Sequence, residues 1–145
     1  MKKFITLATV LAGLSLQVFA QKVEVDKKTG LVTVDDKEAF YLTPKNKSFM
    51  QSDYALENLN HEELAYLKYE EVVRYNSRGQ KSTSDYLMVF TQSGNQCYLT
   101  DFSVITGILK PLAKSIAGAN LVKDGKMAPN EEKKFLLLHN GTFAN

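Results

Sequence analysis

Cysteine, histidine and tryptophan are scarce in this chain, and their scarcity excludes several kinds of site. The 145 residues contain one cysteine, Cys97, two histidines, His61 and His139, and no tryptophan. One cysteine cannot form a disulfide within the chain, and two distant histidines lack the ligand spacing of a zinc site. We therefore predict no metal, no cofactor and a core held together by packing alone.

An excess of charge of one sign is also missing. The chain has 18 basic and 16 acidic residues, and Lys2 and Lys3 lie in an N-terminal segment that we expect to be removed. Without them the two signs balance, and lysines and carboxylates are interleaved along the chain. A protein that binds nucleic acid needs a basic surface to displace counterions, so we predict no nucleic-acid partner.

Motifs that would identify a reaction are absent. The sequence has no G-x-S-x-G segment, no phosphate-binding glycine loop and no calcium loop. Its adjacent acidic pairs are Asp35-Asp36, Glu62-Glu63, Glu70-Glu71 and Glu131-Glu132. Neighbouring residues on a strand point to opposite faces, so such pairs do not converge on an ion. We interpret them as solvated surface.

The N-terminus has the three parts of a secretory signal. Lys2 and Lys3 precede an apolar run over residues 4–16, and Val18-Phe19-Ala20 ends in a small residue. The run is shorter than the roughly 20 residues that span a bilayer. We predict cleavage between Ala20 and Gln21 and no membrane insertion after removal of this signal peptide.

The expected compartment follows from this signal. The first residue after the predicted cleavage is glutamine and not cysteine, so we do not expect a lipoprotein. We predict a periplasmic or secreted protein. The short basic start and the lack of a cysteine pair favour a Gram-negative bacterium over a eukaryotic secretory origin.

Strand patterns dominate residues 21–145, which we expect to form one domain. Short strands are predicted at 22–25, 31–34 and 39–43, the last stopped by Pro44, with a turn at 35–38. A hairpin is predicted from 86–92 and 96–101 around Ser93-Gly94-Asn95. Its alternation places Cys97 on one face and Tyr98 on the other. The polar stretches 44–48 and 76–84 are interpreted as loops.

Residues 60–75 fit two structures. Asn60 with Glu63 resembles a helix capping box, and Leu64, Ala65 and Tyr69 share a helical face. The tyrosines and paired valines favour a strand instead. Cap energies of about 1 kcal/mol are easily outweighed by strand pairing. We therefore predict a strand, with residues 54–59 as its partner.

After Asp101 the apolar spacing becomes helical. Asp101 or Ser103 can cap a helix that continues to Ile116, with Pro111 either breaking it or lying in a first turn. A second helix is predicted from Pro129, and the apolar run 135–138 is placed against the core. The sum is an α+β fold: an antiparallel sheet of about five to seven strands with one or two C-terminal helices packed on one face.

Tyrosines provide the best candidates for a binding surface. The predicted strand region contains Tyr54, Tyr66, Tyr69, Tyr75, Tyr86 and Tyr98. A tyrosine offers an apolar ring and a polar hydroxyl, so an exposed tyrosine face is a common recognition surface. Packing in the core or at its rim is the alternative. We select Tyr54, Tyr66 and Tyr98 as candidate binding residues.

Two hypotheses for function remain. The first is an exported, non-catalytic binding or accessory module with a protein or glycan partner. The second is a small secreted enzyme whose site forms only in three dimensions, with Cys97 or a histidine as its candidate. Cys97 lies in a predicted strand, where a buried, unreactive thiol is the commoner outcome, so we favour the first hypothesis.

The signal gives a direct prediction. Protein recovered from the periplasm or the medium is expected to begin at Gln21, because the signal peptidase recognises the small residue Ala20. N-terminal sequencing measures this start. Material that begins at Met1 would contradict the predicted cleavage.

Overall fold

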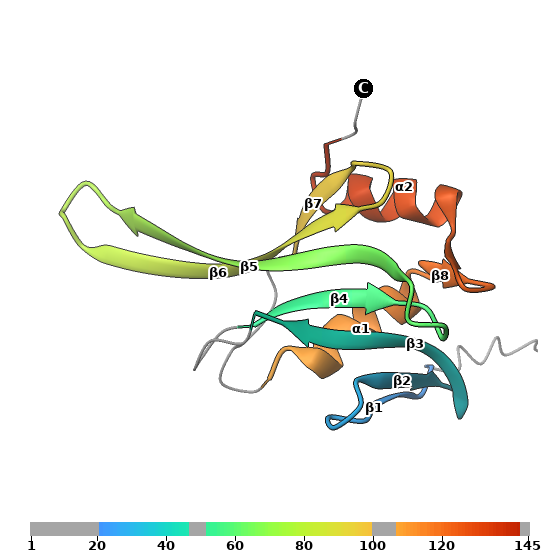
Figure 1. Cartoon of the computed structure of the whole chain (residues 1–145). Helices are drawn as coiled ribbons and strands as arrows, with labels where there is room; N and C mark the ends of the chain where they lie inside the picture. The colour runs from blue at the N-terminus through green and yellow to red at the C-terminus, as the bar shows by residue number, and fades with distance from the viewer. Residues whose placement is uncertain (1–20, 47–51, 100–106, 143–145) are drawn as a thin grey trace, which may run out of the picture.

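The computed structural model describes residues 21–46, 52–99 and 107–142. Seven strands form one antiparallel sheet in chain order, each hydrogen-bonded to the next (Figure 1). They are β1 (Val23–Val25), β2 (Leu31–Val34), β3 (Lys37–Lys45), β4 (Asp53–Glu57), β5 (Glu63–Tyr75), β6 (Lys81–Thr91) and β7 (Gln96–Leu99). The remaining elements are helix α1 (Leu109–Gly118), the hairpin of β8 (Val122–Lys123) and β9 (Lys126–Met127), and helix α2 (Pro129–Leu138). The predicted α+β fold is confirmed.

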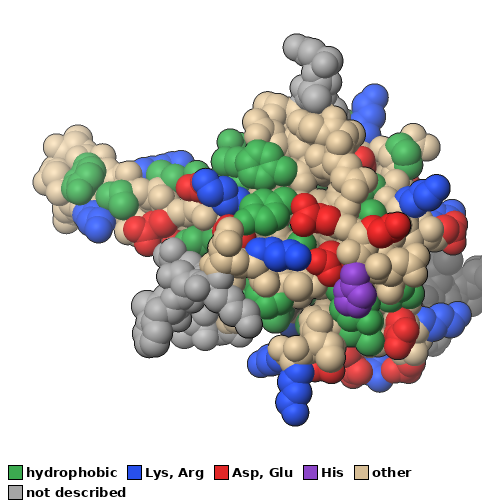
Figure 2. All heavy atoms as spheres, in the orientation of Figure 1, with side chains coloured by type: hydrophobic (Ala, Val, Ile, Leu, Met, Phe, Trp, Pro, Cys, Tyr) green, Lys and Arg blue, Asp and Glu red, His purple; other side chains and the backbone are tan. Residues whose placement is uncertain are grey.

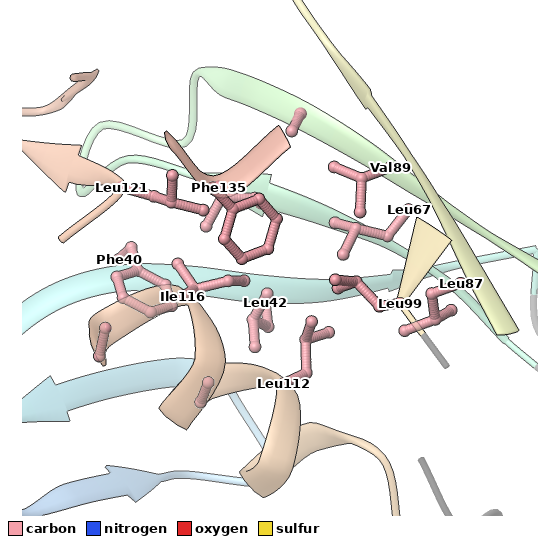
Figure 3. Packing of buried hydrophobic residues seen from close by; sticks show 14 of the residues in the cluster. Phe40, Leu42, Leu67, Leu87, Val89, Leu99, Leu112, Ile116, Leu121 and Phe135 are labelled. Atoms are coloured by element: carbon pink, nitrogen blue, oxygen red, sulfur yellow. The ribbon is translucent and has the colours of Figure 1, made fainter. Parts of the chain in front are cut away.

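Both helices lie on one face of the sheet, and the core fills the space between them and the strands (Figures 1 and 3). Apart from the outer ends of β5 and β6, strand side chains that point to this side are buried or partly buried, and α1 and α2 each contribute one buried face. The core includes Phe40, Leu42, Leu56, Leu67, Leu87, Val89, Cys97 and Leu99 from the sheet, and Leu112, Ile116, Phe135 and Leu136 from the helices. Burial of this set is the main stabilising contribution to the fold.

Short turns join the strands and determine their register. Asp35 and Asp36 have φ angles of 51° and 63°, the left-handed pair of a two-residue hairpin turn. Val34 therefore lies opposite Lys37, and β3 begins two residues earlier than the predicted four-residue turn allows. Asp124 and Gly125 form the same kind of turn between β8 and β9.

The contested segment 60–75 is a strand, as predicted. β5 pairs with β4 on one side, where Tyr54 lies opposite Leu67, and with β6 on the other. Leu64, Ala65 and Leu67 are buried. The prediction of a loop over residues 76–84 is wrong for its second half, because 81–84 continue β6 opposite 72–75.

Pro44 does not stop β3, contrary to the prediction, and it lies opposite Tyr54 of β4. The Leu42 N–H donates to the Gly30 carbonyl oxygen over 2.9 Å, so this nitrogen points toward β2. Backbone direction alternates along a strand, so the Pro44 nitrogen also points that way. The Pro44 nitrogen lies past the end of β2, whose first residue is Leu31. The N–H that proline lacks would therefore have no partner on β2, and the pairing of β2 with β3 loses no hydrogen bond.

The helices keep most of their predicted signals, but the first helix begins later than predicted, at Leu109, because Gly107 has a φ of 91°, which is outside the helical range. Pro111 lies in the first turn of α1, where a proline removes no helical hydrogen bond, and α1 ends at Gly118. The predicted caps Asp101 and Ser103, like the signal peptide, lie outside the described residues. α2 begins at Pro129, as predicted, with Glu131 and Glu132 in its first turn.

The apolar run 135–138 is only half buried, which corrects its predicted place against the core. Phe135 and Leu136 are buried, whereas Leu138 is 79% exposed. Successive helical residues are rotated by about 100°, and the sheet covers one side of α2. Among the described residues, no helix combines the length and apolar character needed to cross a membrane.

The β5–β6 hairpin extends beyond the rest of the sheet as a two-stranded ribbon (Figure 1). Its outer part comprises residues 70–75 and 81–86, joined by the turn 76–80, and we call it the arm. The described pairing of β4 with β5 ends at Leu67, and that of β7 with β6 ends at Leu87. Among the described residues, only the two strands of the arm pair with each other there.

Gly30 provides a test of the close contact between β2 and β3. Its φ is 79°, and a Cβ added there would lie 2.5 Å from the Leu42 carbonyl oxygen. We expect Gly30→Ala to lower the free energy of unfolding by more than about 2 kcal/mol, because a backbone clash adds to the left-handed strain. Urea titration measures the change.

Gly79, in the turn of the arm, is the matched control. Its φ is 73°, but a Cβ there would meet no heavy atom within 4 Å. Gly79→Ala should therefore show the strain alone, about 1 kcal/mol. Equal losses in the two variants would show that the backbone around Leu42 adjusts to the added carbon.

Candidate binding face

The face of the sheet that carries no helix is polar and aromatic, and we call it the open face. Strand alternation and register place its members opposite the core-facing residues. They are Tyr41, Thr43, Lys45, Asp53, Ala55, Glu57, Tyr66, Lys68, Glu70, Tyr86, Met88, Phe90, Gln96 and Tyr98. Figure 2 views this side and shows acidic, basic and hydrophobic side chains intermixed.

Glu57 is the buried charge of this face, with a side chain only 7% exposed. Its Oε1 accepts from Lys45 Nζ at 2.9 Å, and its Oε2 accepts from Thr43 Oγ1 at 2.8 Å. His61 Nδ1 lies 3.2 Å from the same Oε2. Burial raises the pKa of Glu57, but the hydrogen bonds from Lys45, Thr43 and His61 outweigh it, so the pKa lies below its ordinary value.

His61 is positioned by the β4–β5 turn. Its ring stacks on Tyr41, with centroids 4.3 Å apart and planes inclined by 29°. Its backbone has a φ of 62°, and its N–H donates to the Asn58 carbonyl oxygen. The ring thus covers Glu57 and Tyr41 on one side, while 63% of the side chain remains exposed.

Asn58 holds that turn in place. Its Oδ1 accepts from the backbone N–H groups of Asn60 and Glu62, at 2.9 and 3.0 Å. Its Nδ2 donates to the Gly125 carbonyl oxygen at 2.9 Å, which joins the turn to the β8–β9 hairpin. The buried amide therefore connects the turn that carries His61 to the helical layer.

Asp53 orders the next part of the face. It accepts from the Tyr66 hydroxyl at 2.6 Å and from the Tyr69 backbone N–H at 2.9 Å. Burial raises the pKa of Asp53, but these hydrogen bonds and one from Asn46 have the larger, opposite effect. The pKa therefore lies below its ordinary value, and the carboxyl remains ionised. The same hydrogen bond raises the pKa of the Tyr66 hydroxyl, which stays neutral and fixed in direction.

Aromatic rings continue the open face onto β6 and β7. Tyr86 and Tyr98 meet edge to face, with centroids 5.3 Å apart and planes inclined by 76°. Tyr98 is 38% exposed and lies opposite Met88. Tyr66 lies opposite Phe90 on the neighbouring strand pair. The face therefore offers rings whose orientation is determined by their neighbours.

Sequence reasoning located part of this face. Tyr66 and Tyr98, two of the three candidate binding residues, lie on it. Tyr54 lies on the core side, packed against the hydrophobic cluster, and burial raises the pKa of its hydroxyl. Tyr41 was missed, although its alternation with Phe40 and Leu42 was a usable signal. Glu57 had no such signal, because its partners come from other segments.

Cys97 is 0% exposed on the opposite side of the sheet, as its alternation with Tyr98 predicts. Burial raises its pKa to about 12, which favours the protonated thiol at neutral pH over the more nucleophilic thiolate. His139 lies at the end of α2, its ring 4.5 Å from that of Phe135. The helix α2 packs on the side of the sheet that Cys97 faces, whereas His61 lies with Glu57 and Tyr41 on the open face, on the other side of the sheet.

A groove at the rim of the sheet is lined by Glu62, Gln92, Ser93, Lys126 and Glu132. The Glu132 carboxylate within it accepts from Ser93 Oγ at 2.6 Å and from Asn95 Nδ2 at 3.1 Å. Burial raises the pKa of Glu132 and these hydrogen bonds lower it, with a net decrease. The contacts fasten α2 to the β6–β7 turn, which is a structural role.

The fold and this face define an α+β protein with a helix-covered core on one side and a preorganised polar and aromatic surface on the other. Within the described part of the chain, no group of three or more His, Cys, Asp and Glu side chains could hold a metal ion. No protein-family model matches the chain, and no curated protein or solved structure is significantly similar to it.

The state of Cys97 is testable. A thiol reagent should modify it only after denaturant is added, because the side chain is buried. Cys97→Ser should lower the free energy of unfolding by about 1–3 kcal/mol, since a hydroxyl enters an apolar site. Labelling kinetics with and without urea measure access, and rapid labelling of the folded protein would contradict burial.

The pKa of Glu57 gives an acid dependence. Its folded pKa lies below the ordinary value of 4.5, so its ionised form contributes stability above that value. This contribution is lost as the pH falls through the lower, folded pKa. We expect Glu57→Gln to be less stable than the wild type at neutral pH, with a difference that shrinks in acid.

Urea titrations at several pH values between about 3 and 7 measure this effect. Glu38→Gln is the control, because Glu38 is an exposed carboxylate of the neighbouring strand and loses the same charge. A constant difference between wild type and Glu57→Gln across the series would contradict the assigned role of the carboxylate.

Proposed function

We propose that this protein is an exported, non-catalytic binding module that recognises its partner through the open face. The observation that carries the proposal is the array of tyrosine rings and paired charges on the side of the sheet without helices. Export is supported by the tripartite N-terminus, which favours the periplasm or the exterior of a bacterial cell.

The open face has the composition of a recognition surface. Tyrosine provides a large apolar area and a hydrogen-bonding hydroxyl at low conformational cost. Three different strands carry Tyr41, Tyr66 and Tyr98, so a partner that covers the sheet contacts all three. Such rings are enriched at interfaces and among the residues that dominate binding energy.

The face is also rigid where it is charged. Lys45 and Thr43 hold Glu57, and Asp53 holds the Tyr66 hydroxyl, so these groups need little ordering when a partner arrives. Preorganisation lowers the entropic cost of association. Charges of both signs, with Lys68 and Glu70 paired at 2.5 Å, favour a protein surface as partner over a neutral glycan.

One observation favours a second candidate function, a small exported enzyme. His61 is oriented by the Glu57 carboxylate, the arrangement in which a histidine acts as a general acid or base. The ring lies on an exposed face, however, and the same carboxylate is paired with Lys45. Cys97, the other candidate, lies on the opposite side of the sheet. The binding module therefore fits the arrangement better.

Tyr98→Ala tests the binding proposal. The change should alter the free energy of unfolding by about 1 kcal/mol or less, because the ring is partly exposed, yet it should weaken partner capture. Partners are captured from envelope extract with the immobilised protein and identified by mass spectrometry, and the affinity of each variant for the captured partner is then measured by calorimetry.

Tyr75→Ala is the matched control, because Tyr75 is more exposed, at 68%, but lies on the arm and on the other side of the sheet. It should leave the affinity unchanged. If Tyr98→Ala and Tyr66→Phe both bind like the wild type while His61→Ala abolishes a hydrolytic or transfer activity, the enzyme hypothesis replaces this one.

A further inference from the structure

The outer edge of β6 in the arm carries backbone groups that can accept another strand. Asn76 N–H donates to the Gln80 carbonyl oxygen, so this pair closes the ribbon at the turn. In an antiparallel ladder every second residue directs its N–H and C=O outward, which selects Lys81, Thr83 and Asp85 on β6.

The direction of β5 confirms this alternation. Tyr69 lies opposite Leu87, and its N–H donates outward to the Asp53 carboxylate and not to β6. Leu87, its partner, therefore also directs its N–H and C=O outward. Every second residue of β6 before Leu87 does the same, which again gives Asp85, Thr83 and Lys81. Among the described residues, β7 pairs with β6 only as far as Leu87, so no described strand meets this edge.

The arm also has physical reasons to gain a neighbour. A two-stranded ribbon is marginally stable in water, and a third strand adds hydrogen bonds and cross-strand contacts. Val73 and Tyr75 are exposed on the arm. Asp85 lies directly opposite Glu71 on the same face, and like charges at that position are destabilising. A cation beside Asp85 would relieve this repulsion.

We propose that this edge binds the same edge of a second copy of the chain, antiparallel, about a two-fold axis at Thr83. In that register Lys81 of each copy lies opposite Asp85 of the other, and Thr83 lies opposite its own counterpart. Ser82 then faces Ser84. Opposite charges and paired hydroxyls are the favourable cross-strand neighbours, and the partner's Lys81 supplies the cation that Asp85 lacks across the ribbon.

The two charges also select this register over its neighbours. An axis at Lys81 sets lysine against lysine, and an axis at Asp85 sets aspartate against aspartate. An axis at Ser82 or Ser84 leaves both charges opposite uncharged residues. Only the axis at Thr83 pairs both, which is how charged residues make the pairing of an exposed edge specific. The proposed dimer is isologous, the common form of a closed homodimer.

Charge reversal tests the proposal. Sedimentation equilibrium of the purified wild-type protein over a concentration series is expected to show a monomer–dimer equilibrium. Lys81→Asp and Asp85→Lys should each raise the dimer dissociation constant by about tenfold or more, because two symmetry-related pairs change from attraction to repulsion. The double variant Lys81→Asp/Asp85→Lys should recover the wild-type constant.

Mixing the two single variants gives a second measurement. The chain with Lys81→Asp carries two aspartates on its edge, and the chain with Asp85→Lys carries two lysines, so each weakens its own dimer while the mixture forms a heterodimer. Arg74→Asp, on β5, changes the net charge equally and should leave the dissociation constant unchanged. Circular dichroism verifies that each variant is folded.

The outcomes are decisive in both directions. Loss of the dimer in both single variants, with recovery in the double variant and the mixture, supports the edge pairing. A wild-type protein that is monomeric throughout the series overturns it, as does a dimer that both single variants retain. Because the readout is self-association, failure of this proposal is distinct from failure of the open face to bind a partner.

Discussion

Burial of one face of the sheet under two helices is the constraint on which the other features depend. Strand side chains alternate with a period of two, so packing Leu67, Val89 and Leu99 beneath Leu112 and Phe135 forces the intervening residues to the other side. A register slip of one residue would expose the core and bury the charges of the open face. The positions of Tyr66 and Tyr98 are thus consequences of the core.

The buried polar side chains of the described residues are hydrogen-bonded. Glu57, Asn58 and Glu132 are buried, and each is hydrogen-bonded within the described structure. No buried side-chain nitrogen or oxygen of the described residues lacks a hydrogen-bond partner. Because an unpaired buried polar group costs roughly 1–3 kcal/mol, these contacts also determine which turns and rims are rigid. The same contacts that stabilise the fold hold the open face in one geometry.

The molecule therefore divides into parts with different physical character. The centre of the sheet has a dry face and a polar, ordered face, whereas most side chains of the arm are exposed in the described structure and little apolar surface is buried there. The centre suits recognition of a partner by side chains, because its groups are preorganised. The arm suits recognition through the backbone, because its outward N–H and C=O groups lie along an edge of alternating polar residues. The two proposed interactions use these separate properties.

Local patterns in the sequence determined most strands and turns, the place of Pro111 in the first turn of α1, the start of α2 at Pro129, and the opposite directions of Cys97 and Tyr98. These depend on alternation, proline geometry and turn residues, which act within a few positions of the chain. The tertiary structure alone decided that Pro44 continues β3, that residues 81–84 pair in the arm, and that Leu138 is exposed while Leu136 is buried. It also brought Lys45, Glu57 and His61 together and turned Tyr54 to the helix side of the sheet, where it packs against the core. Each of these depends on which segments become neighbours, and that is decided by hydrophobic burial summed over the whole chain and not by any local run of residues.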